Sequence, residues 1–259
     1  MILEVRGLSK RFGGIRAVDD FDLSLAPGEL VGLIGPNGSG KTTVFNVITG
    51  IYAPDAGTVS LDGSPIAGLA PHRINRQGIA RTFQNIRVFR SLSVADNVKV
   101  ARHGLAGYGP VAALCRTGRF RAGEARLAEE CEELLEIFSL QGRRDELAGN
   151  LPYGDQRKLE IARALASNPR ILLLDEPAAG TNPFEVARLK EFILGIRERF
   201  RLTILLIEHR MSLVMEICER IAVMDFGRLI AHGRPAEIRE DPRVIEAYLG
   251  RETLAEDLE

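Results

Sequence analysis

A short segment near residue 40 has the residue types and spacing of a phosphate-binding loop. It follows the pattern G-x-x-x-x-G-K-[ST], in which a glycine-rich turn points N–H groups at phosphate oxygens, a lysine reaches the outer phosphates and a hydroxyl holds Mg²⁺. The residues that carry the pattern are Gly35, Pro36, Asn37, Gly38, Ser39, Gly40, Lys41 and Thr42. This segment therefore predicts a site for a phosphate chain and its metal ion.

The residues on either side of the loop place it between a strand and a helix. Residues 29–34 form an apolar stretch of strand length, and Val44, Val47 and Ile48 follow the loop at helical spacing. The unpaired N–H groups and the dipole at a helix N-terminus favour an anion. We therefore expect the loop to hold phosphate at the start of this helix.

Two adjacent carboxylates end a second apolar run. Residues 171–174 are Ile-Leu-Leu-Leu, typical of a strand covered on both faces, and Asp175 and Glu176 follow. Asp175 is positioned to hold Mg²⁺ through water, opposite the Thr42 hydroxyl, and Glu176 to polarise the water that attacks the γ-phosphate. Two acids at a strand end also suit an ordinary surface turn, but their pairing with a phosphate loop favours the catalytic interpretation.

Three further positions can be assigned a function only in combination with the motifs described above. His209 follows the apolar residues 203–207, where a neutral imidazole can donate to the γ-phosphate or orient the water and Glu176. Gln84 ends an expected strand and can join the Mg²⁺ shell. Residues 151–157 precede a helix, and a glycine at a helix N-terminus offers another anion-binding end. Each position has an ordinary structural explanation when it is taken in isolation.

The composition is that of a soluble globular chain: of 259 residues, 45% are hydrophobic and 27% charged, with a formal net charge of −1. A near-neutral charge argues against a dedicated nucleic-acid binder, which would have a strongly basic face. The charged N-terminus does not fit a signal peptide, and no apolar run approaches membrane-spanning length. Cys115, Cys131 and Cys218 are too scattered for a disulfide framework or a zinc site. We expect a cytosolic protein that reaches a membrane only through a partner.

Strands that alternate with helices predict right-handed crossovers and a mainly parallel sheet, with ligands at the carboxyl ends of its strands. Strands are expected at 3–12, 17–25, 30–34, 58–61, 79–83, 170–174, 203–207 and 221–224, and helices at 155–167, at 183–200 and from residue 212. Residues 93–147 have helical character, interrupted at 104–123. An amphipathic helix within 119–140 is indicated by Leu127, Cys131, Leu134, Leu135 and Phe138.

These motifs, in this order, resemble the ATP-binding subunits of ABC transporters over essentially the whole chain. Residues 35–42 match the Walker A motif of that family and residues 171–176 its Walker B, while residues 151–156 occupy the place of its signature. Gln84 and His209 stand at the positions of the Q-loop glutamine and the switch histidine.

The resemblance implies the organisation of the fold. The fold class is α/β, a P-loop NTPase (RecA-like) core with a mainly parallel sheet, an antiparallel β subdomain and an inserted α-helical subdomain. Residues 1–238 would form the ATP-binding domain, with the core and β subdomain at 1–88 and 160–238 and the helical subdomain at about 89–159. A short C-terminal extension at 239–259 would follow.

The resemblance also implies ATP and Mg²⁺ as cofactors and two subunits that close head to tail around the nucleotide. Glu176, His209 and Gln84 would be catalytic, and Thr42, Gln84 and Asp175 would hold the metal. Phe12 would stack on adenine. The phosphates would contact residues 35–42 and Thr43 of one subunit and, in the second subunit, Pro152, Tyr153, Gly154 and Asp155.

A finer resemblance is to the ATPase of branched-chain (hydrophobic) amino acid importers. It rests on residues 81–87, 153–154, 178–183, 207–211 and 241–250. It implies a peripheral protein at the cytoplasmic face of the cell membrane and uptake of branched-chain or other hydrophobic amino acids. The implied partners are two transmembrane permease subunits, a sister ATP-binding subunit or a second copy of this chain, and indirectly a solute-binding protein outside the membrane. Nucleic acid is not among them.

Two positions depart from the family pattern. Pro152 replaces the signature serine whose hydroxyl contacts the γ-phosphate, and proline offers neither a side-chain donor nor an N–H group. It also biases Leu151 towards an extended conformation. We expect that phosphate contact to be weakened rather than abolished. Asn182 replaces the usual aspartate of the D-loop, which leaves any charged contact there in doubt.

Several alternatives remain open at this point. The chain would also fit the ABC ATPase of another importer or of a lipid-transport system, or a soluble ABC protein, although those usually carry two cassettes or a long coiled-coil insertion. A P-loop kinase or GTPase is disfavoured because the chain has no N-K-x-D motif. The basic cluster Arg116, Arg119, Arg121 and Arg126 is either a solvated face or a contact with lipid headgroups or the partner.

Overall fold

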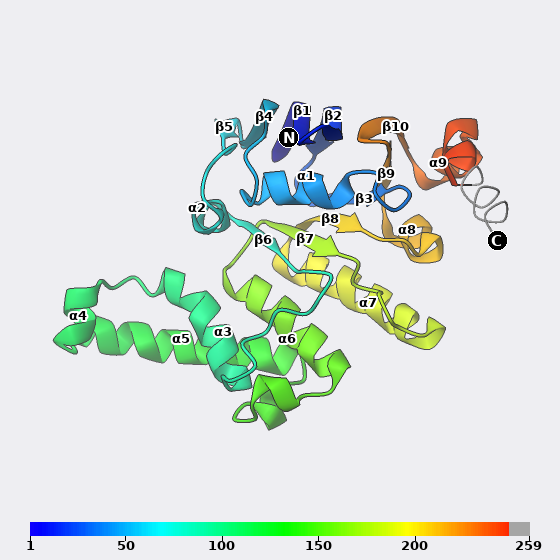
Figure 1. Ribbon diagram of the computed structural model, residues 1–259. Helices are drawn as coiled ribbons and strands as arrows, with labels where there is room; N and C mark the ends of the chain where they lie inside the picture. The colour runs from blue at the N-terminus through cyan, green and yellow to red at the C-terminus, as the bar shows by residue number, and fades with distance from the viewer. Residues whose placement is uncertain (249–259) are drawn as a thin grey trace. The chain divides into compact units, whose positions relative to one another are not determined.

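The computed structural model describes residues 1–248, apart from the side chains of Pro110 and Pro183 (Figure 1). Within these residues the chain divides into two compact units. The first comprises Met1–Ile74 and the chain from Arg170 onward, and the second comprises Asn75–Pro169. The expected C-terminal extension at 239–259 lies, from residue 249 onward, outside the described residues.

The first unit contains a mainly parallel sheet. Strand β3 pairs in parallel with β8 and β9, β7 pairs in parallel with β8, and β10 pairs antiparallel with β9, in the order β10-β9-β3-β8-β7. Every residue of β3, β7 and β8 is buried, which explains why these strands are continuous apolar runs. The five strands are β3 (Leu30–Ile34), β7 (Ile171–Asp175), β8 (Thr203–Ile207), β9 (Arg220–Asp225) and β10 (Arg228–Gly233).

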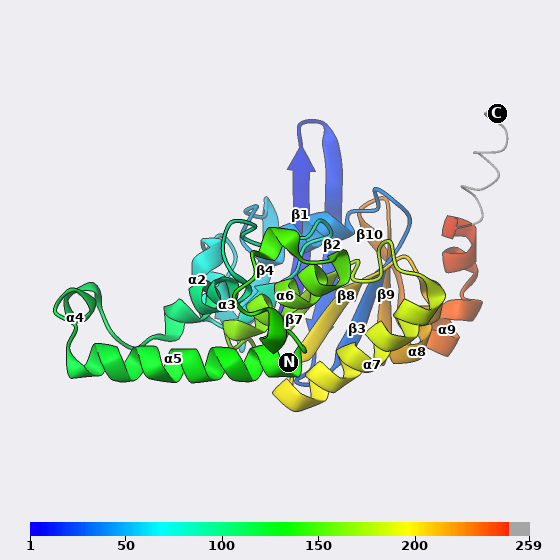
Figure 2. The ribbon, with the colours of Figure 1, turned by 90° about the horizontal axis from the view of Figure 1, so that it is seen from below.

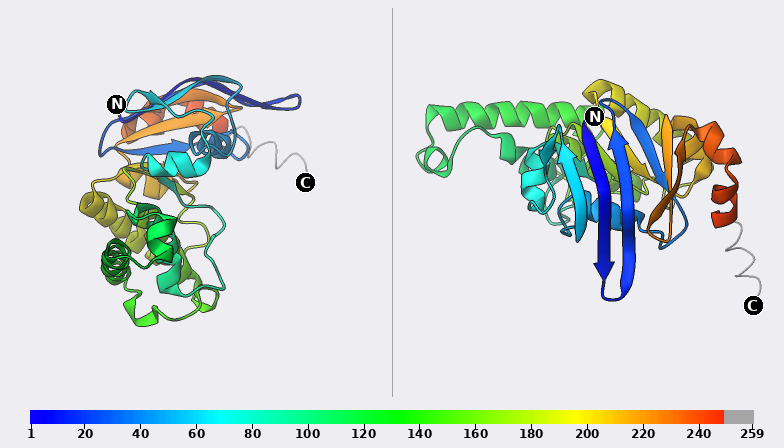
Figure 3. Two further views of the ribbon diagram at one scale, coloured as in Figure 1. Left: turned by 90° about the vertical axis from the view of Figure 1, so that its left-hand side faces the viewer. Right: turned by 90° about the horizontal axis from the view of Figure 1, so that it is seen from above.

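An antiparallel sheet of order β2-β1-β4-β5 forms the other layer of strands in this unit. Its long strands β1 and β2 lie side by side as a hairpin (Figure 3). Apolar residues such as Val18, Phe21 and Leu25 are buried while their neighbours are partly exposed, so one face of the sheet is packed. The four strands are β1 (Leu3–Phe12), β2 (Ile15–Leu25), β4 (Ala56–Leu61) and β5 (Ser64–Pro65).

Helices of the first unit follow the strands that bear the motifs. Helix α1 (Lys41–Ile48) follows β3, α7 (Pro183–Phe200) follows β7, and α8 (Met211–Ile217) follows β8. This is the strand–helix alternation predicted from the sequence. Two short helices complete the unit, α9 (Pro235–Glu240) and, at the boundary between the units, α2 (Pro71–Arg76).

The second unit is mostly helical. Helix α3 packs against α5 and α6, and α4 lies at the N-terminal end of α5 (Figure 2). The predicted amphipathic face is confirmed, because Leu127, Cys131, Leu134, Leu135 and Phe138 are all buried. The elements are β6 (Ile79–Arg81), α3 (Val94–Arg102), α4 (Pro110–Leu114), α5 (Gly118–Ile137), α6 (Tyr153–Ala166) and the 3-10 turns η1 (His103–Leu105), η2 (Gln141–Arg143) and η3 (Ala148–Asn150).

The sequence-based predictions differ from the structure mainly at element boundaries. Helix α6 begins at Tyr153 rather than at Asp155, because Pro152 already stands at its N-cap and Leu151 is extended, with φ −66° and ψ 146°. Strand β6 ends at Arg81 rather than at residue 83. The prediction missed β10, a partly exposed strand whose apolar residues show no clear alternation.

Candidate functional site

The phosphate-loop residues connect β3 to α1 through a turn that only glycine fits at two positions. Gly35 has φ +147° and Gly40 has φ +108°, values that other residues rarely adopt. A Cβ atom at Gly35 would lie 2.0 Å from the Met224 carbonyl oxygen, and one at Gly40 would lie 2.3 Å from the Ala17 carbonyl oxygen. The loop is therefore packed tightly against the backbone of β9 and β2. This close approach fixes the direction in which its N–H groups point.

The Lys41 ammonium lies inside the loop rather than in solvent. Its Nζ atom donates to the carbonyl oxygens of Gly35 and Pro36, at 2.8 and 2.9 Å, and the side chain is only 5% exposed. The buried Ser39 hydroxyl lies 3.3 Å away. The structure thus holds a cation at the centre of the turn, where it can meet an anion. Asn37, Gly38 and Thr42 are exposed on the loop, and Thr43 is half-buried.

Strand register brings the ends of the motif-bearing strands to one edge of the sheet. Leu33 of β3 pairs with Ile207 of β8, and Ile207 in turn pairs with Asp175 of β7. The Glu176 N–H also donates to the Ile207 carbonyl oxygen, at 2.9 Å. The loop after β3, the carboxylates after β7 and the histidine after β8 therefore leave the sheet side by side, as the sequence predicted for ligands of a parallel sheet.

The two predicted carboxylates have different surroundings. Asp175 is the last residue of β7 and is 3% exposed. Glu176 follows with φ +48°, a left-handed conformation that is strained for a residue with a side chain. Its Oε1 atom lies 2.8 Å from His209 Nε2, which is half-exposed. The structure thus joins two of the residues predicted to be catalytic in one hydrogen-bonded pair.

Glu208, a carboxylate that the sequence analysis did not assign to the site, holds the loops that carry this pair. Glu208 is 2% exposed and accepts the N–H groups of Ala178, His209 and Arg210, at 2.6, 3.1 and 3.3 Å. It therefore fixes the loop after β8 to the loop after β7. The available signal was an acid placed directly after a fully buried strand.

The loop that contains Asn182 is fixed by its own helix. The Asn182 side chain accepts the Glu185 N–H at 3.0 Å, and the Glu185 side chain accepts the Asn182 N–H at 2.8 Å, which forms a capping box at the start of α7. The Arg210 guanidinium donates to the Thr181 carbonyl oxygen. Asn182 thus acts here as a helix cap.

Phe12, the predicted adenine-stacking residue, is partly exposed at the end of β1. Its ring packs edge-to-face on Tyr52, with 5.0 Å between the ring centroids, and Lys10 Nζ lies 5.7 Å from the Phe12 centroid. Exposed aromatic rings of this kind provide a flat surface on which a base can stack. Tyr52 was not predicted from the sequence.

In the second unit, the residues of the predicted signature stand at an open helix N-terminus. Pro152 is the N-cap of α6 and gives it no side-chain hydrogen bond. Tyr153 is exposed, and a Cβ at Gly154 would meet nothing within 4 Å. The Asp155 carboxylate lies 3.2 Å from Lys158 and 3.6 Å from Arg143. The Asp155 N–H already donates to the Pro152 carbonyl oxygen at 3.0 Å, so the N–H groups of Tyr153 and Gly154 and the exposed Tyr153 hydroxyl are the donors that this segment can offer.

The same helix α6 is connected to the segment that contains Gln84. Glu160, which is buried, accepts the N–H groups of Phe83 and Arg87 at 3.3 and 3.1 Å. Its neighbour Arg157 donates to the Phe83 carbonyl oxygen at 2.8 Å and to Glu160 at 3.0 Å. Gln84 itself is exposed just beyond β6. A buried ion pair on α6 thus holds the backbone on both sides of the exposed glutamine.

The donor set suits Mg²⁺. This ion prefers oxygen ligands and is usually bound by one or two protein groups together with phosphates and water. The exposed Thr42 hydroxyl and the Asp175 carboxylate are such groups. Among residues 1–248, no cluster of three or more His, Cys, Asp or Glu side chains could hold a metal ion without further ligands.

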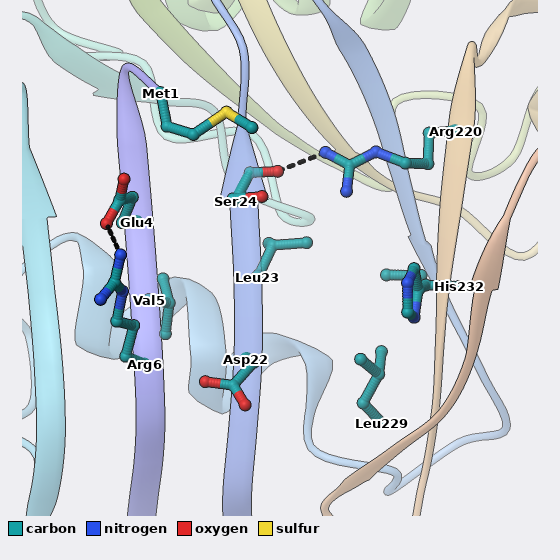
Figure 4. Close-up of a pocket in the computed structure, with 11 residues that line it drawn as sticks. Met1, Glu4, Val5, Arg6, Asp22, Leu23, Ser24, Arg220, Leu229 and His232 are labelled. Carbon is teal, nitrogen blue, oxygen red and sulfur yellow. Dashed lines mark hydrogen bonds and ion pairs between the residues drawn. The ribbon is translucent and has the colours of Figure 1, made fainter.

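A hollow of about 460 Å³ lies elsewhere in the first unit, between β1, β2, β9 and β10 (Figure 4). Its wall contains Glu4 and Arg6 on β1, and Arg220, which donates to the Ser24 carbonyl oxygen. None of the phosphate-loop residues and neither of the two carboxylates after β7 lines it. We therefore do not assign it to the nucleotide.

The fold and the site define a P-loop nucleotide-binding protein of the ATPase type. Comparison with known proteins makes this assignment more specific. The ABC transporter family matches residues 18–179, and a family described as branched-chain amino acid ATP-binding cassette transporter matches residues 228–253. The chain belongs to the ABC transporter family, as an ATP-binding subunit.

Individual relatives cover nearly the whole chain. The chain is 47% identical to the high-affinity branched-chain amino acid transport ATP-binding proteins BraF of Pseudomonas aeruginosa and LivG of Escherichia coli K12, over 96% of this chain and 98% of theirs. It is 38% identical, with the same coverage, to the lipopolysaccharide export ATP-binding protein LptB of E. coli K12. A crystal structure of an ABC transporter cassette in its ADP conformation superposes with a TM-score of 0.82 at 32% identity, covering 96% of this chain and 98% of that one. Within residues 1–248, no helix has the length and apolarity needed to cross a membrane.

Proposed function

We propose that this chain binds and hydrolyses ATP to drive the import of branched-chain or other hydrophobic amino acids. The observation that carries the proposal is the 47% identity, over almost the full length, to two ATP-binding proteins named for this transport. The match of residues 228–253 to a family of the same description supports it independently of the nucleotide motifs. A lipid-export role is the second candidate, supported by the lower identity of 38% to LptB.

The phosphate loop would bind the triphosphate, with Lys41 on the outer phosphates and the N–H groups of the turn on their oxygens. Thr42, Asp175 and Gln84 are proposed to hold Mg²⁺, which supplies neutralisation of charge on the phosphates when it is bound. Phe12 would stack on adenine. Thr43, which follows the metal-binding threonine, would lie beside the phosphates.

Glu176 is proposed as the base that takes a proton from the attacking water. Its hydrogen bond to His209, 2.8 Å long, supports a role for the histidine in orienting this carboxylate. Glu208 would act as a positioning residue, because the three N–H groups that it accepts belong to the loops that carry the pair. Orientation of this kind contributes to catalysis by holding the water in line with the phosphorus atom.

We also propose that two ATP-binding subunits close head to tail, with the nucleotide between the loop of one and residues 152–155 of the other. The second subunit would be a sister chain or a second copy, and the pair would dock on two permease subunits at the cytoplasmic face of the membrane. The expected domain boundaries, 1–88 with 160–238 and about 89–159, remain part of this proposal. ATP would bridge the two surfaces and ADP would not, so hydrolysis would open the dimer.

The test is uptake into vesicles that contain the chain with its co-purified permeases. Leucine should accumulate only with ATP and solute-binding protein present, and the chain with Glu176→Gln should not support uptake. Uptake of a polar amino acid in place of leucine would contradict the proposed substrate class but would leave the ATPase assignment unchanged. Extraction of lipopolysaccharide instead of leucine uptake would favour the second candidate.

A further inference from the structure

The end of the helical unit around α4 carries exposed apolar side chains. Leu114 is 86% exposed and Val111 is 75% exposed, among the highest values for large apolar residues in the described part of the chain. The two residues are three apart on α4, so their side chains lie on the same face of that helix. Residues so exposed add nothing to the core of this unit. Their apolar surface is available to something outside the chain.

Three cationic side chains follow this apolar face in the sequence. Arg116 follows α4, and Arg119 and Arg121 lie in the first turn of α5; all three are exposed, and no Asp or Glu occurs from residue 97 to residue 123. Within residues 1–248, none of these three arginines makes an ion pair. We call the five residues Val111, Leu114, Arg116, Arg119 and Arg121 the basic tip. Its three guanidinium groups are thus exposed without an ion-pair partner among the described residues.

The tip is held on an ordered support. The Tyr108 ring packs edge-to-face on Phe120, with 5.0 Å between centroids, and a Cβ at Gly123 would come within 2.7 Å of the Tyr108 ring. The Tyr108 hydroxyl donates to Glu124, and this bond raises the pKa of Tyr108. The Thr117 hydroxyl caps α5 by accepting the Phe120 N–H. The basic tip therefore lies at a defined end of the long helix α5 (Figures 1 and 2).

We propose that the basic tip inserts into the headgroup region of an anionic lipid surface. Shallow insertion of a few apolar side chains, with arginines around them, is the chemistry by which short amphipathic segments bind anionic membranes. A stable protein interface buries about 800 Å² on each partner, more than two side chains of a five-residue helix provide. The proposal goes beyond ATP hydrolysis and needs only that the chain works beside a membrane.

The test uses the full-length chain without permeases. It is sedimented with vesicles of phosphatidylcholine alone or with about one third phosphatidylserine, at low and high salt. The chain should bind the anionic vesicles, and binding should fall with salt. Replacing Arg116, Arg119 and Arg121 by Gln should weaken binding about a hundredfold, about fivefold for each charge. Val111→Ser with Leu114→Ser should weaken it as well, at unchanged net charge.

The matched control removes three other exposed arginines, with Arg6→Gln, Arg228→Gln and Arg243→Gln. It has the same net charge as the arginine variant of the tip and should bind vesicles as the unchanged chain does. Equal loss in the control would attribute binding to net charge and overturn the proposal. Unchanged ATP binding shows that each variant is folded.

A local readout separates the tip from the rest of the surface. Cys115 lies between Leu114 and Arg116 and is the only exposed cysteine, the others being buried. A polarity-sensitive fluorophore on Cys115 should shift to the blue with anionic vesicles. No shift, or loss of permease binding in the tip variants with vesicle binding unaltered, would point to a protein partner and overturn the lipid assignment. Neither result depends on which solute is transported.

Discussion

The buried Glu208 provides the most direct test of how the catalytic loops are held. Glu208→Ala removes the carboxylate that accepts three backbone N–H groups, those of Ala178, His209 and Arg210. Hydrogen bonds to a charged group contribute about 1.5 to 3 kcal/mol each. Water can enter beside the half-exposed His209 and replace part of this loss. We therefore expect the free energy of unfolding to fall by about 3 kcal/mol.

The measurement is urea unfolding of the purified chain, together with ATPase kinetics. Glu216→Gln is the matched control, because this exposed acid pairs only with Lys190 in the described structure and should change stability by less than about 0.5 kcal/mol. In Glu208→Ala, kcat should fall with little change in KM for ATP, since Glu208 positions the Glu176–His209 pair rather than the nucleotide. A variant that keeps the stability and the kcat of the unchanged chain would refute this account of Glu208.

Three further predictions concern the site and the thiols. Glu176→Gln should bind ATP, hydrolyse it at least a hundredfold more slowly and accumulate as a closed dimer in size-exclusion chromatography; hydrolysis at the ordinary rate would remove Glu176 from its role. Lys41→Ala should abolish ATP binding in calorimetry, because the ammonium at the centre of the loop is lost; retained affinity would contradict the assigned loop. At about pH 8 only Cys115 should react with iodoacetamide, because burial raises the pKa of Cys131 to about 11 and of Cys218 to about 12, so their thiolates form only at much higher pH. Rapid modification of Cys218 in the folded chain would disprove its burial.

The fully buried strands of the parallel sheet could be predicted from the sequence. Residues 171–175 and 203–207 are buried throughout, so their apolar runs were complete; the strand at 203–207 was predicted with correct ends, and the strand predicted at 170–174 was one residue too early. The phosphate loop was equally clear, because close backbone packing at Gly35 and Gly40 demands glycine. The fold class followed from these elements and their order.

Other parts left no local signal. Strand β10 is a partly exposed edge strand whose pairing with β9 depends on tertiary structure, and its sequence has no clear alternation. The carboxylates of Glu208 and Glu160 accept hydrogen bonds from backbone N–H groups up to about eighty positions away in the sequence, as in the bond from the Phe83 N–H to Glu160. Hydrogen bonds to backbone groups place no constraint on the partner's residue type. Reasoning from side chains alone therefore could not find them.

The ion pair on α6 has a mechanical consequence. Arg157 and Glu160 hold the chain at Phe83 and Arg87 through hydrogen bonds to main-chain atoms. A displacement of that stretch is thus transmitted to the helix that starts at Tyr153, whatever side chains the stretch exposes. The exposed side chains of that stretch can therefore change during evolution to suit a new neighbour, while the contacts of Arg157 and Glu160 with its backbone are kept.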